Sequence, residues 1–177
     1  MSVANIHATC VLLGSAGTAL GAPEQAGLLL LGESGSGKSD LALRLIERGA
    51  ILVADDRVEL WVRAGRLFGR APANIAGLLE VRRTGILRLP YAPEAPITLV
   101  IALDPPGVYE TAKSRLPEPL RYAPPAELLL PETGQPPMLG LAAFEGSAPA
   151  KAILAAAAFH RAQFSGELNP LCGFHPL

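Results

Sequence analysis

Residues 32–39 form a phosphate-binding motif. They read Gly32, Glu33, Ser34, Gly35, Ser36, Gly37, Lys38 and Ser39, the complete pattern GxxxxGKS. Such a loop wraps its backbone N–H groups around a polyphosphate, while its lysine reaches the outer phosphates and its hydroxyl binds Mg²⁺. A glycine-rich turn that matches by chance is disfavoured, because the apolar strand 27–31 precedes the motif and residues 40–48, apolar at helical spacing, follow it up to Gly49. The sequence therefore predicts a strand, a nucleotide phosphate loop and a helix, in this order.

Asp55 and Asp56 are the first candidates for an acid that works beside the bound phosphates. They follow an apolar strand predicted at residues 51–54, directly after the phosphate-loop helix. A right-handed crossover would return both carboxylates to the sheet edge that carries Ser39. Neighbouring strand residues point in opposite directions, so one acid can accept the proton of a hydroxyl substrate while the other serves a metal or a structural hydrogen bond. The alternative is a plain turn after a strand.

Asp104 and Glu80 are rival acids. Asp104 ends the apolar strand predicted at residues 97–103, the Walker B pattern of many nucleotide hydrolases, and pattern alone does not choose between it and the Asp55–Asp56 pair. Glu80 lies between apolar residues, where a carboxylate is costly unless a metal or an arginine compensates it. It can equally be an exposed acid at a strand edge.

The remaining elements frame this site. His7 lies on a strand predicted at residues 6–13, which we expect to pair with the phosphate-loop strand; a lone histidine there is more often a core residue than a catalyst. The pattern also predicts a long-looped hairpin across 14–26, a second hairpin of strands 58–63 and 66–69, a helical turn at 73–79, irregular structure over 104–137, and a final helix over 148–163 after the N-cap Ser147.

Composition limits the class of protein. At 177 residues, 1–177 is taken as one domain. With 15 basic and 16 acidic residues, the chain has a formal net charge of −1, so its overall charge does not attract it to nucleic acid or to a membrane surface. Two cysteines without metal or disulfide spacing, no secretion signal and no apolar run of membrane length predict a cytoplasmic protein. Seven arginines between positions 57 and 88 make either a face for phosphate or an acidic partner, or a solvated surface.

Residues 27–60 resemble the catalytic domain of HPr kinase/phosphorylase. The run GESGSGKSDLALRLIERG, followed after Ala50 by ILVADDRVEL, is similar to that family's GDSGxGKSETALEL(I/V)xRGHxLVADDxVE. Residues 78–86, LLEVRRTGI, resemble its signature LLEIRGxGI. The resemblance implies an α/β fold, a P-loop kinase-like domain of the HPr kinase/PEP carboxykinase type with a mixed sheet and flanking helices, in a short form lacking the N-terminal domain.

The resemblance also implies an activity: ATP- and Mg²⁺-dependent phosphorylation of a serine of HPr, the phosphocarrier protein of a bacterial phosphotransferase system, by a hexamer. His7, Lys38 and Asp55 would be catalytic, with Asp55 the proton acceptor and Asp56 the second choice. Ser39 and Glu80 would hold Mg²⁺, and residues 32–39 would bind ATP. Asp104 would fall outside the catalytic set.

The sequence departs from that family at three places. Arg83 stands where the signature has glycine, residues 87–96 replace a stretch rich in glycine and phenylalanine, and residues 138–146 lack the arginine of the family's GRN segment. Because that segment is associated with phosphorolysis, its loss argues against the reverse reaction. Two alternatives stay open: a kinase with a small-molecule acceptor, and a regulatory module that binds ATP without turnover.

Overall fold

A computed structural model describes residues 2–103 and 120–165 of the chain. The helices are α1 (Ser15–Thr18), α2 (Lys38–Glu47) and α3 (Ala148–Ser165), with 3₁₀ turns at Ala126–Leu128 and Glu132–Gly134. The strands are β1 (Val3–His7), β2 (Thr9–Leu12), β3 (Gly27–Leu31), β4 (Ile51–Ala54), β5 (Arg57–Arg63), β6 (Arg66–Arg70), β7 (Leu78–Val81), β8 (Gly85–Arg88), β9 (Ala95–Leu103), β10 (Leu120–Arg121) and β11 (Pro137–Leu141).

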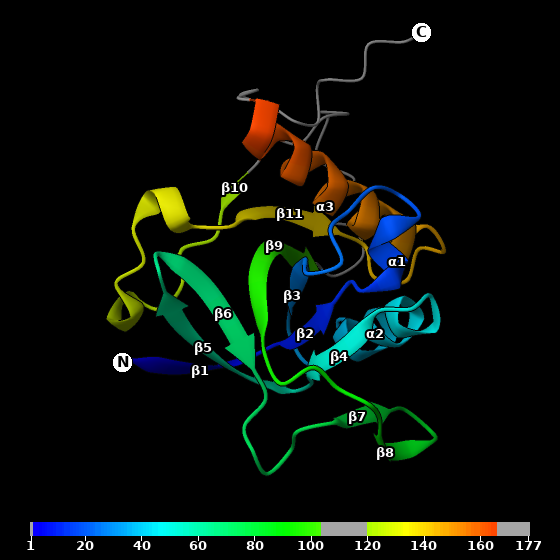
Figure 1. Cartoon of the computed structure of the whole chain (residues 1–177). Coiled ribbons are helices and arrows are strands. Elements are labelled where there is room, and N and C mark those ends of the chain that lie inside the picture. The colour runs from blue at the N-terminus through cyan, green and yellow to red at the C-terminus, as the bar shows by residue number, and fades with distance from the viewer. Residues whose placement is uncertain (1, 104–119, 166–177) are drawn as a thin grey trace, which may run out of the picture.

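Among the described residues, nine strands form one mixed sheet that curls around β9. The order is β1-β5-β6-β9-β3-β2-β4, with β10 paired to β11 and β11 paired to β9. One edge of β9 runs parallel to β3, while its other edge pairs first with β6 and then, further along, with β11. The sheet therefore divides into β1, β5 and β6 on one side and the β3-β2-β4 half with α1 and α2 on the other (Figure 1). The predicted mixed α/β fold is confirmed.

Strand β3 is buried on both faces, which explains its unbroken apolar sequence. Leu28 and Leu30 belong to the core cluster that includes residues of α2 and α3, whereas Leu29 belongs to a second cluster with residues of β5 and β6. All three leucines are fully buried. The strand that carries the phosphate loop is thus fixed at the centre of the molecule.

Helix α2 confirms the predicted helix after the phosphate loop. Leu41, Ala42 and Leu45 form its buried side, and the helix contacts β2 and α3. Gly37, its N-cap, has φ +94°, a left-handed conformation that favours glycine. The predicted start of the last helix is also confirmed, since α3 begins at Ala148.

The strand predicted at residues 6–13 is wrong in one respect, because it breaks at Ala8. β1 pairs with β5, with His7 opposite Arg57, while β2 pairs with β3 and β4. The chain passes at this point from one half of the curled sheet to the other. His7 therefore lies beside β5 and not beside the phosphate-loop strand.

Both predicted hairpins are confirmed, as β2–β3 and β5–β6. Residues 73–77 form turns rather than a helix, and β7 and β8 make a hairpin that the sequence did not predict. Asp104, the Walker B candidate, and Cys172 lie outside the described residues. Cys10 is fully buried, and burial raises the pKa of its thiol to about 12. Within residues 2–103 and 120–165, no helix is long and apolar enough to cross a membrane.

Candidate active site

The phosphate loop and three of the candidate acids, Asp55, Asp56 and Glu80, line one pocket of about 290 Å³. β3 and β4 are both antiparallel to β2, which lies between them, so their carboxyl ends meet at one edge of the sheet as predicted. The lining residues are His7, Thr9, Ser34, Gly35, Gly37, Lys38, Ser39, Asp40, Leu43, Asp55, Asp56, Glu80, Val81, Arg82 and Phe144. The structure therefore brings together all the predicted catalytic and metal-binding residues.

The phosphate loop keeps donors that are not satisfied by a side-chain cap or a described hydrogen-bond partner. Gly37 offers no side-chain cap to α2, which leaves backbone N–H groups of its first turn for an anion. The Ser36 hydroxyl is buried and has no hydrogen-bond partner among the described residues. A loop with unpaired N–H groups and an orphan hydroxyl fits a bound polyphosphate.

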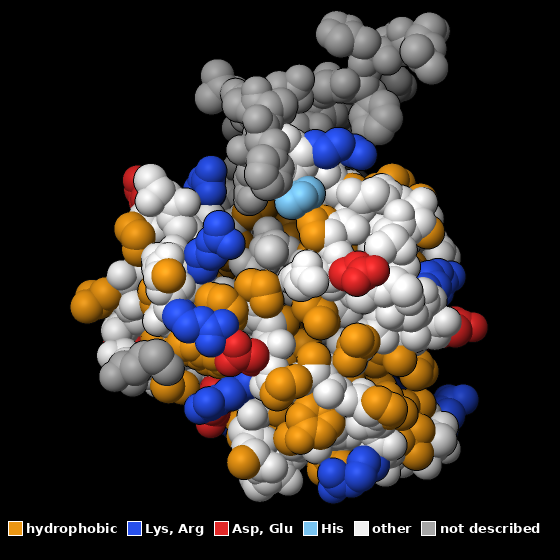
Figure 2. Space-filling model, in the orientation of Figure 1, with side chains coloured by type: hydrophobic (Ala, Val, Ile, Leu, Met, Phe, Trp, Pro, Cys, Tyr) orange, Lys and Arg blue, Asp and Glu red, His pale blue; other side chains and the backbone are white. Residues whose placement is uncertain are grey.

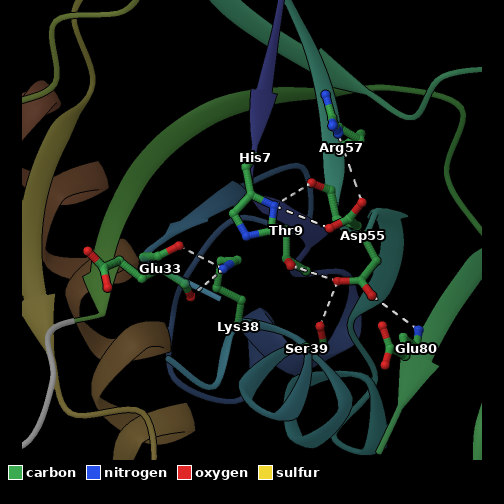
Figure 3. Close-up of polar contacts among 10 residues, drawn as sticks. His7, Thr9, Glu33, Lys38, Ser39, Asp55, Arg57 and Glu80 are labelled. Carbon is green, nitrogen blue, oxygen red and sulfur yellow. Dashed lines mark hydrogen bonds and ion pairs between the residues drawn. The ribbon is translucent and has the colours of Figure 1, made fainter. Parts of the chain in front are cut away.

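Lys38 is closed onto the loop itself. Its Nζ donates to the carbonyl oxygens of Gly32 at 2.7 Å and Glu33 at 2.9 Å, and the residue is 6% exposed (Figure 3). Burial lowers the pKa of Lys38, while the nearby charges of Asp55 and Asp56 act in the opposite direction. The ammonium group thus lies where it can turn from loop carbonyls to phosphate oxygens.

Asp55 is buried and accepts three hydrogen bonds. Its Oδ1 accepts from Thr9 Oγ1 at 2.7 Å and from Ser39 Oγ at 2.9 Å (Figure 3). Its Oδ2 accepts from the backbone N–H of Glu80 at 3.1 Å, and the residue is 5% exposed. This carboxylate ties β2, α2 and β7 together around the hydroxyl of the phosphate loop.

Asp56 points elsewhere because the chain turns sharply at this residue. It has φ +64°, and the Arg57 N–H donates to the Asp55 carbonyl across it. The Asp56 carboxylate is exposed and lies between His7, whose Nδ1 is 3.2 Å from Oδ1, and Arg57, whose Nε is 3.9 Å from Oδ2. The prediction that the two acids face different partners is confirmed.

His7 contacts Asp56 twice. Its Nδ1 is also 3.0 Å from the Asp56 carbonyl oxygen. A carbonyl can only accept, so Nδ1 donates this hydrogen bond and Nε2 of a neutral ring is left as an acceptor. The ring is half-exposed at the mouth of the pocket, which differs from the packed core histidine that the strand pattern favoured.

Glu80 is exposed on β7, as an acid at a strand edge, and its side chain lines the pocket. Ser39, Asp55 and Glu80 offer hydroxyl and carboxylate oxygens, the ligands that Mg²⁺ prefers. The described residues contain no cluster of three or more His, Cys, Asp or Glu that could hold a metal alone. This donor set fits Mg²⁺, which is commonly bound through one or two carboxylates together with substrate phosphates and water.

The arginine-rich stretch divides into two groups. Arg63 pairs with Glu94 and covers Phe68, and Arg70 pairs with Glu59 and covers Trp61, so these arginines belong to a solvated surface. Figure 2 shows basic and acidic side chains scattered over the viewed face rather than gathered in one basic patch.

The arginines of the β7–β8 hairpin differ. Arg82 lines the pocket, with its Nη2 3.4 Å from where a Cβ on Gly35 would lie. Arg83 has φ +65° at the position where the resembled signature has glycine. The turn therefore keeps a glycine-like conformation without the glycine.

Two pocket residues, Thr9 and Phe144, and one residue behind the pocket wall, Arg44, were not predicted from the sequence. Thr9 binds Asp55 across 46 residues of sequence, Phe144 comes from the segment after β11, and Arg44 holds that segment through the carbonyl oxygens of Ala143 and Glu145. The position of Thr9, two residues after His7, is only a weak indication that it belongs to the site. Nothing in the sequence near Phe144 or Arg44 indicates a place near the pocket.

Comparison with known proteins supports the same reading. Residues 22–92 match the family model of the HPr Serine kinase C-terminal domain. The chain is 52% identical to the HPr kinase/phosphorylase of Clostridium tetani over 64 residues, which are 36% of this chain and 21% of that protein. It is 45% identical to that of Clostridium acetobutylicum over 85 residues, which are 44% of this chain and 28% of that protein. The matched region thus spans about a quarter of the length of these relatives.

A solved structure extends the likeness to nearly the whole chain. The Hpr(Ser) kinase/phosphatase from Coxiella burnetii superimposes with a TM-score of 0.65 at 24% identity, covering 92% of this chain and 93% of that one. At this identity the match establishes the fold. Residues 22–92 are therefore similar to the HPr Serine kinase C-terminal domain, and the described residues share the fold of that HPr(Ser) kinase/phosphatase.

Proposed function

We propose that this chain transfers the γ-phosphoryl group of ATP to a serine of the phosphocarrier protein HPr, in the presence of Mg²⁺. The names of the relatives support the reaction and the acceptor. The observation that carries the proposal is the pocket itself: Lys38 and Ser39 lie on one wall, and an exposed acid, Asp56, lies on the other. A kinase site needs both a cradle for the phosphates and a carboxylate that a protein hydroxyl can reach.

Ser39 and Glu80 would hold Mg²⁺, which supplies positive charge to the transferring phosphoryl group. Asp55 would hold the Ser39 hydroxyl in place through its 2.9 Å hydrogen bond, and Thr9 and the Glu80 N–H would hold Asp55. Lys38 would exchange its two loop carbonyls for phosphate oxygens. In this proposal Asp55 belongs to the catalytic set through Ser39.

We propose Asp56 as the proton acceptor, which reverses the order of preference from the sequence. Both oxygens of Asp55 already accept hydrogen bonds inside a buried site, whereas Asp56 is exposed at the mouth where a protein hydroxyl arrives. His7 would orient Asp56, since one side of its ring donates to the Asp56 backbone and faces its carboxylate. Asp55 remains the alternative acceptor.

The proposal is tested by mass spectrometry of HPr incubated with the full chain, ATP and Mg²⁺. The expected product is HPr with one added phosphate on a serine, absent when Mg²⁺ is chelated or Lys38 is changed to Met. ATP binding without any phosphoserine would refute the proposal and would favour a regulatory module. Turnover of ATP with a metabolite but not with HPr would favour a small-molecule acceptor.

Three further features belong to the same proposal. Residues 1–177 would act as a single catalytic unit, because all described strands except β7 and β8 belong to one sheet. This unit would act in the cytoplasm. By resemblance the unit forms a hexamer, which light scattering of the purified chain would test. Because the segment at 138–146 lacks arginine, adding phosphate to phosphorylated HPr should release little or no pyrophosphate.

A further inference from the structure

Phe144 is an exposed aromatic residue in the wall of the pocket. It is 65% exposed, yet it lies against the phosphate loop: a Cβ on Gly37 would be 3.0 Å from its Cζ and 3.2 Å from its Cε1. Among the described residues, no other Phe, Tyr or Trp lines this pocket. None of the catalytic roles proposed above involves the Phe144 ring.

The backbone on both sides of Phe144 is anchored. Arg44 of α2 donates to the carbonyl oxygens of Ala143 and Glu145, and its guanidinium also pairs with Asp40. Ala143 is buried. The Glu145 carboxylate pairs with Lys151 of α3, which lowers the pKa of that carboxyl. The ring therefore projects from a fixed segment.

The topology places Phe144 on the opposite side of the loop from the acids. Across the sheet the order is β11, β9, β3, β2, β4, with β11, β9 and β3 parallel. Phe144 follows the carboxyl end of β11, whereas Asp55 and Asp56 follow that of β4. If the reacting end of a nucleotide faces the acids, its nucleoside end must leave the loop on the side of Phe144.

We propose that Phe144 is the platform on which the base of the bound nucleoside triphosphate stacks. This inference rests on the proposed function and adds the site for the nucleoside. An aromatic ring recognises the π-face of a base, so this contact would favour purines for their larger face without selecting one purine by hydrogen bonds. Phe144 would then contribute to nucleotide affinity and leave the chemistry of transfer to the other wall.

The test compares two probes by calorimetry on the full chain: Mg·ATP and Mg·tripolyphosphate, which has the phosphates but no nucleoside. For Phe144→Ala we expect the Kd for ATP to rise about 5- to 150-fold, the effect of removing one base-stacking aromatic residue. The Kd for tripolyphosphate should stay unchanged, and Phe144→Trp should keep the affinity for ATP. Leu129→Ala, a change at another highly exposed apolar residue, serves as the control for lost surface.

Each other outcome overturns the inference. If both probes weaken equally in Phe144→Ala, the residue supports the loop and not the base. If ATP affinity is unchanged while the KM for HPr rises, Phe144 is a contact for the protein acceptor. If wild type binds ATP normally and Phe144→Ala binds it equally well, the stacking role fails while the proposed function stands; if wild type binds no ATP, the proposed function fails as well.

Discussion

Replacement of Thr9 by valine tests the hydrogen-bond arrangement around Asp55. Thr9 is fully buried, and its hydroxyl lies 2.7 Å from a carboxylate oxygen of Asp55. Valine keeps the shape of the side chain and removes the donor. A hydrogen bond to a charged group contributes about 1.5–3 kcal/mol to the free energy of unfolding. For a chain of this size, that corresponds to a fall in Tm of roughly 3–12 °C.

Thr98→Val is the matched control. The Thr98 hydroxyl donates to a neutral acceptor, the Gly27 carbonyl oxygen, at 3.2 Å. Loss of this hydrogen bond should lower the free energy of unfolding by only about 0.5–1.5 kcal/mol. Urea unfolding of both variants gives the two losses directly. We expect the larger loss for Thr9→Val, and we expect it to shrink when Asp55 is already Asn, because the two residues interact.

Two results would refute this reasoning. One is a loss for Thr9→Val no greater than that for Thr98→Val. The other is an equal loss for Thr9→Val in the Asp55 and the Asp55→Asn backgrounds, which would mean that the negative charge of Asp55 adds nothing to the contribution of Thr9.

Three further predictions follow from other parts of the pocket. Burial lowers the pKa of Lys38, so the unfolded chain binds the Lys38 proton more tightly than the folded chain, and the free energy of unfolding of wild type should rise as the pH increases from the lowered pKa to 10.5. Over this pH range, Lys38→Met should become less stable relative to wild type in urea unfolding. A stability difference that does not change with pH would contradict the prediction. Gly37→Ala should lower the free energy of unfolding by about 1–3 kcal/mol more than Gly65→Ala. Both glycines have a left-handed backbone, but a Cβ atom on Gly37 would lie 2.7 Å from the Ala143 Cβ, whereas a Cβ atom on Gly65 would meet no atom within 4 Å. Equal losses in the two variants would argue against this close contact. Arg44→Met should let chymotrypsin cleave after Phe144 about tenfold faster, with Arg48→Met as the control, because two anchoring hydrogen bonds are lost; an unchanged rate would contradict this.

The sequence predicted the parts of the site that depend on local spacing. β3, the phosphate loop and α2 follow from an apolar run, a glycine pattern and a helical period in adjacent stretches. The place of Asp55 and Asp56 follows from the end of a strand and a simple crossover. These features need no knowledge of distant residues.

The features that were missed depend on contacts between distant segments. The break at Ala8 exists because the sheet curls, so one run of apolar residues serves two halves of it. Arg44 meets Ala143 across 99 residues, and nothing near either residue signals the contact. The β7–β8 hairpin was missed because Arg83 takes the left-handed turn position where glycine or asparagine would signal a turn.

The most direct measurement is the single-turnover rate of phosphoryl transfer from ATP to HPr by Asp55→Asn and Asp56→Asn, with the Kd for Mg·ATP measured beside it. We predict that Asp56→Asn slows transfer by roughly 10²- to 10⁴-fold, the contribution of a general base, and leaves the Kd nearly unchanged. Asp55→Asn should weaken Mg·ATP binding as well, because it loosens Ser39. Full transfer by Asp56→Asn, together with loss of transfer but normal ATP binding in Asp55→Asn, would contradict the account.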